Sequence, residues 1–310
     1  MPYLFTNLIG SFVLDDHLKT IESIPFKNLQ EYQNRKEAES RLKKKYPHLQ
    51  DVPAEKLPQV LALFKDKKYF LQFYERNIEL TQASIKNSVS EDVFIIQTIA
   101  NIAELDKVCN LLSKRLREWY SWYAPEISEK ITNHEQFVES ILHKNKKELG
   151  AELKIGASMG ADFEKVHVEE IMLLAKQVSQ LYELRQQHEA YLEKIMKKYC
   201  PNLLELGGAT IGAKLLELSR GLKHLALLPA STIQLLGAEK ALFRHITSGS
   251  KSPKYGILFQ HPFIQQAKRD EKGKAARMLA DKLSLCARLD YFKGEFKAKE
   301  YKKELEEKFR

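Results

Sequence analysis

The feature that most constrains this chain is the absence of glycine between Gly10 and Gly150. In the same stretch the prolines cluster before residue 60, and after them only Pro125 occurs before Pro201. Glycine and proline are the residues that most often end a helix. Long uninterrupted helices are therefore expected through the middle of the chain.

The first part of the sequence has a different pattern. Short apolar runs at residues 3–5, 11–14 and 21–26 are separated by turn-forming residues, which predicts a small antiparallel sheet. A polar helix over 29–46 and a second helix around Val60 would complete a small α/β unit. An apolar face with three- and four-residue steps then predicts a long helix over 93–119, which ends before Pro125. We expect this helix to belong with an N-terminal domain of residues 1–118.

Residues 119–200 are expected to form a helical hairpin, with helices over 133–149 and 163–200. The second helix carries a ladder with alternating three- and four-residue steps, which is typical of coiled coils. This ladder predicts a seam between two copies of the chain, in which the polar residues Arg185 and His188 set the register. The alternative is an amphipathic helix packed on its own domain. The predicted seam residues are Ile171, Leu174, Val178, Leu181, Arg185, His188, Leu192 and Ile195.

The net positive charge of the chain comes entirely from its last third. Residues 1–200 contain 29 basic and 29 acidic side chains, whereas residues 201–310 contain 21 basic and 12 acidic ones. Helices are expected over 213–227, 231–247, 269–289 and 297–309, which makes 201–310 a helical, basic domain. An acidic partner is expected there. Nucleic acid is the first candidate and an anionic membrane surface is its rival.

Several other classes of protein find no support in the sequence. The three cysteines are far apart and odd in number, the histidines lack metal-ligand spacing, and no catalytic motif is present. The run from Gly207 to Lys214 lacks the Gly-Lys-Ser/Thr of a phosphate-binding loop. Neither a secretory signal nor an apolar run of about 20 residues is visible, so we expect a soluble intracellular protein. Because no catalytic motif is present, we also expect that it is not an enzyme.

The most informative basic stretch begins at Gly237. On a helix, Lys240 and Arg244 share one face, and a loop rich in Ser, Gly and Lys follows. Such a loop can bring its backbone N–H groups and its lysines close to phosphates. A second basic helix starts near Lys272. The alternative reading is a solvated basic surface without a partner.

Three segments of this region together resemble the Nop domain. They are GAEKALFRH (237–245), KYGILFQHP (254–262) and KGKAARMLADKLSLCARLDYF (272–292). The resemblance continues upstream through LREWYSWYAPEI (116–127) and GASMGADFEKVHVEEI (156–171). Box C/D ribonucleoprotein core proteins of the Nop56/Nop58 type share this RNA–protein binding module with a spliceosomal Prp31-type protein. The short N-terminal unit and the near absence of a Lys/Glu-rich tail resemble the archaeal members.

The resemblance implies a mainly α fold with a small α/β N-terminal domain, a long antiparallel coiled-coil hairpin and an all-helical C-terminal Nop domain. It implies a non-catalytic scaffold that pairs with itself and bridges a fibrillarin-like methyltransferase to a box C/D guide RNA. The scaffold would grip the kink-turn of that RNA together with a small kink-turn-binding protein. Cytoplasmic location is expected for an archaeal chain and nucleolar location for a eukaryotic one. The alternative is a Prp31-like splicing protein without a methyltransferase partner.

The resemblance also implies which residues meet RNA. In the family the partner enzyme performs the 2′-O-methylation with S-adenosylmethionine, so this chain needs no cofactor or metal. Lysines and arginines are assigned to phosphates, and the region of Gly256 to close approach. Ala241, Leu242 and Phe243 are assigned to packing or to protein–protein contact. The residues expected to bind the ribonucleoprotein are Gly237, Ala238, Glu239, Lys240, Arg244, His245, Lys251, Lys254, Tyr255, Gly256, Lys272, Lys274 and Arg277.

Overall fold

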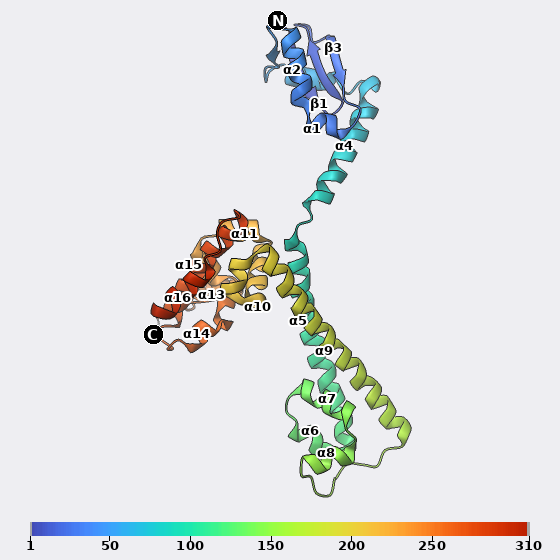
Figure 1. Ribbon diagram of the computed structural model, residues 1–310, viewed down its shortest axis with the longest axis vertical. Coiled ribbons are helices and arrows are strands. Elements are labelled where there is room, and N and C mark those ends of the chain that lie inside the picture. Colours follow the sequence, from blue (N-terminus) through green and yellow to red (C-terminus); the bar gives the residue numbers. More distant parts are fainter. Residues whose placement is uncertain (1, 309–310) are drawn as a thin grey trace. The chain divides into compact units, whose positions relative to one another are not determined.

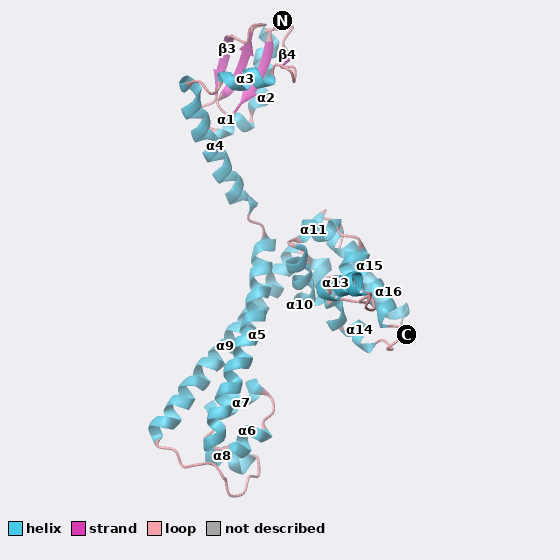
Figure 2. Cartoon of the chain, turned by 180° about the vertical axis from the view of Figure 1, so that it is seen from behind, coloured by secondary structure: helices cyan, strands magenta, loops and turns pink. Residues whose placement is uncertain are grey.

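The computed structural model of the chain describes residues 2–308. It is mainly helical, with one small sheet near the N-terminus, which confirms the expected fold class (Figure 1, Figure 2). Contacts divide the chain into two units that meet between Ser90 and Glu91. The division differs from the expected boundary after residue 118, because the long helix that starts at Glu91 packs against later helices rather than against the sheet.

The first unit is a four-stranded sheet covered by short helices (Figure 2). The strands β1 (Tyr3–Asn7), β2 (Gly10–Leu14) and β3 (Thr20–Pro25) pair antiparallel, as expected. A fourth strand, β4 (Gln50–Asp51), pairs parallel to β1, and at two residues it is too short to leave a pattern in the sequence. The sheet order is β3-β2-β1-β4.

Alternating residues of β2 supply the two faces of this sheet. Phe12 and Leu14 pack with Val60 and Phe64, whereas Val13 packs with Leu42 on the other side. The helix expected over 29–46 is two helices that meet at Asn34, because the backbone leaves helical geometry there. The helices of this unit are α1 (Leu29–Gln33), α2 (Arg35–Lys45), α3 (Leu57–Leu63) and α4 (Lys67–Ser88).

The second unit is built on an antiparallel hairpin of two long helices, α5 (Glu91–Tyr123) and α9 (Lys165–Tyr199). Between them lie α6 (Pro125–Lys130), α7 (His134–His143) and α8 (Lys146–Glu152) at the tip of the hairpin (Figure 1). The helix expected over 133–149 is thus two helices, since Asn145 caps a new one with a capping box. The main partner of α9 is α5, and not this shorter pair.

The predicted ladder on α9 is used inside the chain. Ile171, Val178 and Leu192 are buried against helices of the same chain, while Leu174, Leu181 and Ile195 are half-buried. Side chains that are already covered cannot also form a seam with a second copy. The amphipathic alternative therefore describes the buried ladder residues, whereas a seam between two copies at the half-buried ones stays a prediction.

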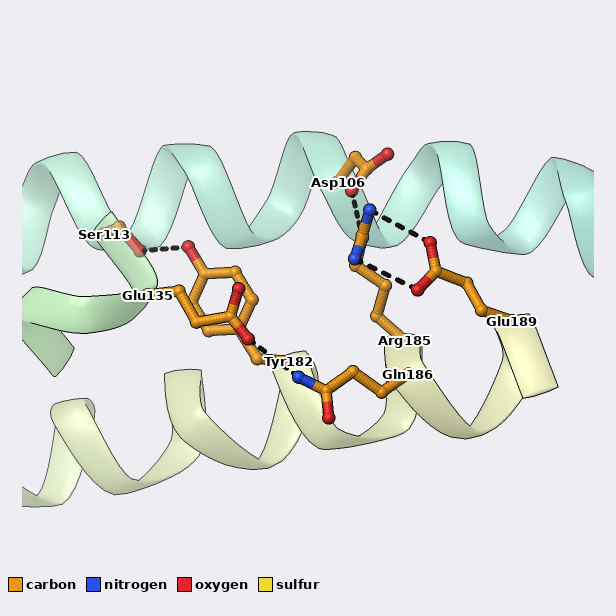
Figure 3. A network of polar contacts seen from close by, with 7 residues as sticks. All are labelled: Asp106, Ser113, Glu135, Tyr182, Arg185, Gln186 and Glu189. Carbon is orange, nitrogen blue, oxygen red and sulfur yellow. Dashed lines mark hydrogen bonds and ion pairs between the residues drawn. The ribbon is translucent and has the colours of Figure 1, made fainter. Parts of the chain in front are cut away.

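A polar network crosses the hairpin where the ladder is interrupted (Figure 3). The guanidinium of Arg185 pairs with Asp106 on α5 and with Glu189 one turn further along α9. Tyr182 shares a hydrogen bond of 3.1 Å with Ser113. The polar seam position thus fixes the register of α9 on α5 within one chain. His188 is half-buried beside this network.

The remaining helices pack around α15 (Lys272–Tyr291), whose buried face is rich in alanine and leucine. The expected helix over 213–227 starts earlier and ends at Arg220, which adopts a left-handed conformation. The helix expected over 231–247 divides at Gly237, whose φ is +84°. Residue 309 of the expected last helix lies outside the described residues. The elements are α10 (Pro201–Ser219), α11 (Leu222–Leu227), α12 (Ala230–Leu235), α13 (Glu239–Ser248), the 3₁₀ helix η1 (Ile257–Gln260), α14 (Pro262–Gln266) and α16 (Ala298–Lys308).

The base of the hairpin and these C-terminal helices share one hydrophobic core. Ile95 and Ile99 of α5 and Met196 of α9 belong to the same buried cluster as Leu203 and Leu283. A boundary at residue 200 therefore marks a change in composition but not a break in packing.

A buried pair, Asp290 and Asn202, holds the last helices in place. The carboxylate of Asp290 accepts hydrogen bonds from the backbone N–H groups of Asn202 and Leu203, at 3.1 and 2.8 Å. The side-chain oxygen of Asn202 in turn accepts from Lys297 and Ala298 at 2.8 and 3.1 Å. The start of α10, the end of α15 and the start of α16 are thereby tied together.

Candidate nucleic-acid interface

The helix α13 lies on the surface of the second unit, and none of its residues is buried. It starts directly after Gly237, where the left-handed backbone turns the chain out of α12. The N–H of Gly237 donates to Oε1 of Glu239 at 2.7 Å, so this predicted binding residue stabilises its own turn. Ala238 is half-buried and lies at the N-terminus of α13.

Two cations lie on the open surface of this helix. Lys240 and Arg244 are exposed, and within residues 2–308 neither forms an ion pair with a carboxylate. A solvated cation without an intramolecular partner keeps its full charge available for phosphate. The side chains of Phe243 and Ile246 are also uncovered, with 67% and 73% of their surface exposed.

The uncovered apolar side chains correct one expectation. Ala241, Leu242 and Phe243 were expected to pack or to contact another protein. Phe243 and its neighbour Ile246 face solvent, and Ala241 and Leu242 are only half-buried. Large exposed apolar side chains beside unpaired cations are typical of a surface that meets both protein and nucleic acid. The exposure of Phe243 leaves it available for the second expected role, contact with another protein, which stays a prediction.

The loop after α13 is arranged by its own residues. Nδ1 of His245 is hydrogen-bonded to the carbonyl of Ser250, and Gly249 closes the helix in a left-handed conformation. Lys251 is exposed on this loop. His245 therefore shapes the loop that presents Lys251.

Gly256 makes a close approach, but to its own chain. A Cβ atom at this position would lie 1.9 Å from the carbonyl oxygen of Leu236. The N–H groups of Gly256 and Ile257 donate to the carbonyls of Gln234 and Leu236 at 2.8 and 2.7 Å. Packing against the end of α12 explains the need for glycine here, and the expected close approach of RNA to this region stays a prediction.

Tyr255 is likewise part of an internal arrangement. Its ring is half-buried and stacks on Phe259, with centroids 4.7 Å apart. The ammonium of Lys272 lies 5.1 Å from the centre of the Phe259 ring, a cation–π contact that links this segment to α15. Phe259 is the member of this group that the sequence pattern did not single out, although it lies within the segment 254–262.

The backbone and stem of Lys254 connect the loop to the second basic helix. Its carbonyl accepts a hydrogen bond of 2.6 Å from Nε2 of Gln234, and its side chain lies beside Gly273. Lys272 is half-buried, whereas Lys274 and Arg277 are exposed at the start of α15. The structure thus gathers Lys254, Tyr255, Gly256 and Lys272 into one cluster. Lys240 and Arg244 stand apart on α13, and none of the described hydrogen bonds or ion pairs joins them to this cluster.

Among the described residues, two further features are absent, a metal site and a membrane-spanning helix. No group of three metal-ligating side chains is found among residues 2–308. Within the same residues, no helix combines the length and apolarity that crossing a bilayer requires. The chemistry available is therefore charge, exposed apolar surface and backbone shape.

The comparisons with known proteins identify the family of the chain. A family model described as "Nop: snoRNA binding domain, fibrillarin" matches residues 101–310. The chain belongs to the Nop family. An uncharacterized NOP5 family protein of Methanocaldococcus jannaschii is 43% identical over 230 residues, which cover 69% of this chain and 56% of the relative.

Eukaryotic members of the Nop family also match the chain. Nucleolar protein 58 of Yarrowia lipolytica is 38% identical over 66% of this chain and 43% of its own length. Nucleolar protein 56 of Caenorhabditis elegans is 39% identical over 65% of this chain and 46% of its own length. The chain spans about half the length of the curated relatives it matches. A crystal structure of a fibrillarin/Nop5p complex aligns over 99% of this chain and 100% of that chain, with 24% identity and a TM-score of 0.47.

Proposed function

We propose that this Nop-family chain is a non-catalytic scaffold of a box C/D ribonucleoprotein that directs 2′-O-methylation of rRNA or tRNA by a guide RNA. Its C-terminal helices would grip a kink-turn RNA together with a small kink-turn-binding protein. A fibrillarin-like methyltransferase would supply the chemistry, with S-adenosylmethionine bound to that enzyme. The complex would act in the cytoplasm of an archaeal cell or in the nucleolus of a eukaryotic one.

The observation that carries the proposal is the composition of the α13 surface. Lys240 and Arg244 are unpaired cations suited to phosphates, and Phe243 and Ile246 are exposed apolar side chains beside them. RNA alone would use the cations, whereas a bound protein would cover the apolar side chains. A composite of RNA and protein uses both.

The first unit offers a surface for the methyltransferase. The helix α4 has 22 residues and none of them is buried. Phe70, Tyr74 and Ile78 lie four residues apart on it, and 53%, 54% and 40% of their surface is exposed. An exposed apolar stripe of this kind favours a protein partner. We assign methyltransferase docking to this stripe.

Pairing of two copies would use the outer faces of the hairpin. Val108, Leu111, Trp119 and Trp122 fall on one face of α5 at about 3.6 residues per turn, and all four are exposed. The ladder on α9 is covered by α5, so this second apolar face is the better candidate for a homodimer contact. A symmetric pair would hold two RNA-binding ends and two enzyme-binding ends in fixed relation.

The test is a salt series of binding between the full chain and a kink-turn RNA, with and without the small kink-turn-binding protein. We expect tight binding to the preformed RNA–protein pair. The double variant Lys240→Ala and Arg244→Ala should bind more weakly. Its plot of log affinity against log salt should be shallower by about 0.7 to 0.9 for each phosphate that the variant no longer neutralises.

The matched control is Lys194→Ala with Lys223→Ala, which removes two exposed cations elsewhere in the same unit. It should keep the wild-type slope. Equal slopes for both double variants would contradict the phosphate assignment. Capture of a methyltransferase by the full chain tests the other proposed contact. If the wild type captures none, and Phe70→Ser and Tyr74→Ser do not differ from it, the splicing-type alternative is favoured.

A further inference from the structure

A groove in the second unit lies outside the surface described above. It has a volume of about 880 Å³ and runs between the end of α9, the start of α10 and α16. A second hollow of about 360 Å³ adjoins it between α10, α14 and α16. Both are lined by Glu205, Gly208 and Lys302, so they form one continuous depression. We call it the α10–α16 groove.

The groove exists because α10 is broken in its middle. Gly208 has φ +72° and ψ 165°, values that interrupt the helix. A Cβ atom added to Gly208 would meet no atom within 4 Å, so the floor of the groove is open at this point. The carbonyl of Leu206, next to the break, accepts a hydrogen bond of 2.9 Å from Nε2 of His261. The carbonyl beside the break therefore has a hydrogen-bond donor within the fold.

The lining of the groove combines lysines with an exposed aromatic ring. Lys197, Lys299 and Lys302 line it against two carboxylates, Glu193 and Glu205. Lys302 and Glu205 are 4.0 Å apart, at the limit of an ion pair, and Lys302 keeps 54% of its side chain exposed. The larger hollow therefore has one more lysine than carboxylates, and Glu306 adds a third carboxylate in the smaller hollow.

Phe296 forms one wall of the groove, and 47% of its surface is exposed. The ammonium of Lys299 lies 6.0 Å from the centre of its ring. An open aromatic face flanked by lysines is the combination that single-stranded nucleic acid uses, since bases stack on the ring and phosphates meet the cations. Paired bases in a duplex would not be free to stack on this ring.

The position of the groove connects it to the proposed interface. The second hollow ends at Pro262, Phe263 and Gln266 of α14. Only His261 separates α14 from η1, whose Phe259 carries the stack with Tyr255. A strand that passes the predicted binding residues Lys254 and Tyr255, just before η1, would meet the groove next.

We propose that the α10–α16 groove binds a single-stranded RNA segment that continues from the kink-turn. This inference rests on the proposed function, because it extends the same RNA along the surface. Phe296 stacks on one base of that segment. Lys197, Lys299 and Lys302 contact its phosphates.

The experiment uses the full chain, the small kink-turn-binding protein and two RNAs. One RNA is a kink-turn hairpin with a flush end, and the other carries a single-stranded extension of about ten nucleotides. We expect the extension to tighten binding several-fold. It should also steepen the salt dependence by about 0.7 for each additional phosphate that the protein neutralises.

The groove variant is Lys299→Ala with Lys302→Ala, and both side chains are exposed on α16. It should lose most of the gain in affinity that the extension gives. On the extended RNA, the slope of its log affinity against log salt should be shallower than that of the wild type by about 1.4. Binding to the flush RNA should stay at the wild-type level. Phe296→Ala should reduce the gain without changing the slope. The control Lys303→Ala with Lys308→Ala removes two cations of α16 that do not line the groove, and it should behave as wild type.

Three outcomes would overturn the inference. The groove variant could keep the full gain, or it could lose affinity equally for both RNAs. Alternatively, polyglutamate could displace the extension as well as oligouridine does at equal ionic strength, which would indicate an acidic protein as the occupant. Failure of the proposed function has a different signature, because neither RNA would then bind to the wild type or to any variant.

Discussion

Arg185 of α9 reaches across the hairpin to the carboxylate of Asp106 on α5, at the one place where the apolar ladder is interrupted (Figure 3). The same guanidinium pairs with Glu189 at 3.1 Å. A sliding of α9 along α5 would separate these charges while leaving much of the apolar packing available. The pair therefore selects one register of the hairpin.

The Asp106→Asn variant should lower the free energy of unfolding by about 0.5 to 1 kcal/mol, because the pair is partly exposed and therefore screened by solvent. Equilibrium denaturation of the full chain measures this change. Glu104→Gln is the matched control, since Glu104 is exposed on the same helix and makes none of the described ion pairs. An equal loss in both variants would mean that general helix charge, and not the pair, is responsible.

The largest single loss of stability is expected at Asp290. Its replacement by alanine leaves the N–H groups of Asn202 and Leu203 without their acceptor in a buried site. Each unsatisfied buried donor costs about 1 to 3 kcal/mol, so the Asp290→Ala variant should be destabilised by about 3 kcal/mol or more. Asp281→Ala, at an exposed position of the same helix, should change stability by less than about 0.5 kcal/mol. Thermal or chemical unfolding compares the two, and similar values would contradict the role of the buried carboxylate.

The stability of the second unit should depend on pH through His261. Burial lowers the pKa of this imidazole, and Nδ1 accepts a hydrogen bond of 3.2 Å from the N–H of Phe263. The neutral form is thus favoured in the folded state. Because the pKa of His261 in the folded state lies below its unfolded value of about 6.5, its contribution to the free energy of unfolding is complete above that pH. This contribution is lost as the pH falls toward the folded pKa.

Unfolding curves recorded between about pH 8 and pH 5 test this dependence. Burial also lowers the pKa of His134, so the wild-type curve contains both groups. The difference between the wild type and His261→Gln isolates His261. His48→Gln, at an exposed position, should retain the full wild-type dependence. Parallel curves for the wild type and His261→Gln would disprove the assignment.

Substitution of Gly256 should disturb folding more than binding chemistry. A Cβ atom there would collide with the carbonyl of Leu236, which is backbone and cannot rotate away. The Gly256→Ala variant should be destabilised by about 3 kcal/mol, as overpacked sites are. Gly249→Ala is the comparison, since its added Cβ meets no atom within 4 Å and only its left-handed backbone is strained. A Gly256→Ala chain with unchanged melting temperature would show that the close approach is dispensable.

The oligomeric state can be tested on the outer face of α5. Leu111→Glu with Trp122→Glu should convert a dimer to a monomer in light scattering with little effect on the melting temperature, because 68% and 72% of these side chains are exposed. Leu174→Glu is the contrasting variant. Leu174 packs on the core of the hairpin, so a charge there should lower stability first. A dimer that survives the α5 variant would move the contact elsewhere.

The sequence predicted those parts of the fold that depend on local pattern. The three longer strands follow from short apolar runs, and the long helices follow from the lack of glycine and proline. The ladder on α9 predicted a seam with a second copy, but a three- and four-residue ladder is equally satisfied by α5 of the same chain. Only the contacts of Ile171 and Val178 distinguish the two.

The candidate site was predicted as a set of residues but not as a surface. The exposure of Lys240 and Arg244 agrees with the expected cations, whereas Tyr255 and Gly256 serve internal packing. Charge and residue type are visible in the sequence, but the direction of a side chain depends on helices far away along the chain. The groove beside Phe296 illustrates this, since its walls come from α9, α10 and α16.

The core shared by the hairpin and the C-terminal helices determines which fragments of the chain can fold on their own. A fragment that begins at Pro201 would strip Ile95, Ile99 and Met196 from their contacts and present the bare side of α10 to water. Such a fragment would aggregate or bind RNA nonspecifically, and its measured RNA affinities would not represent those of the full chain. A fragment that begins at Glu91 keeps all of these core residues together.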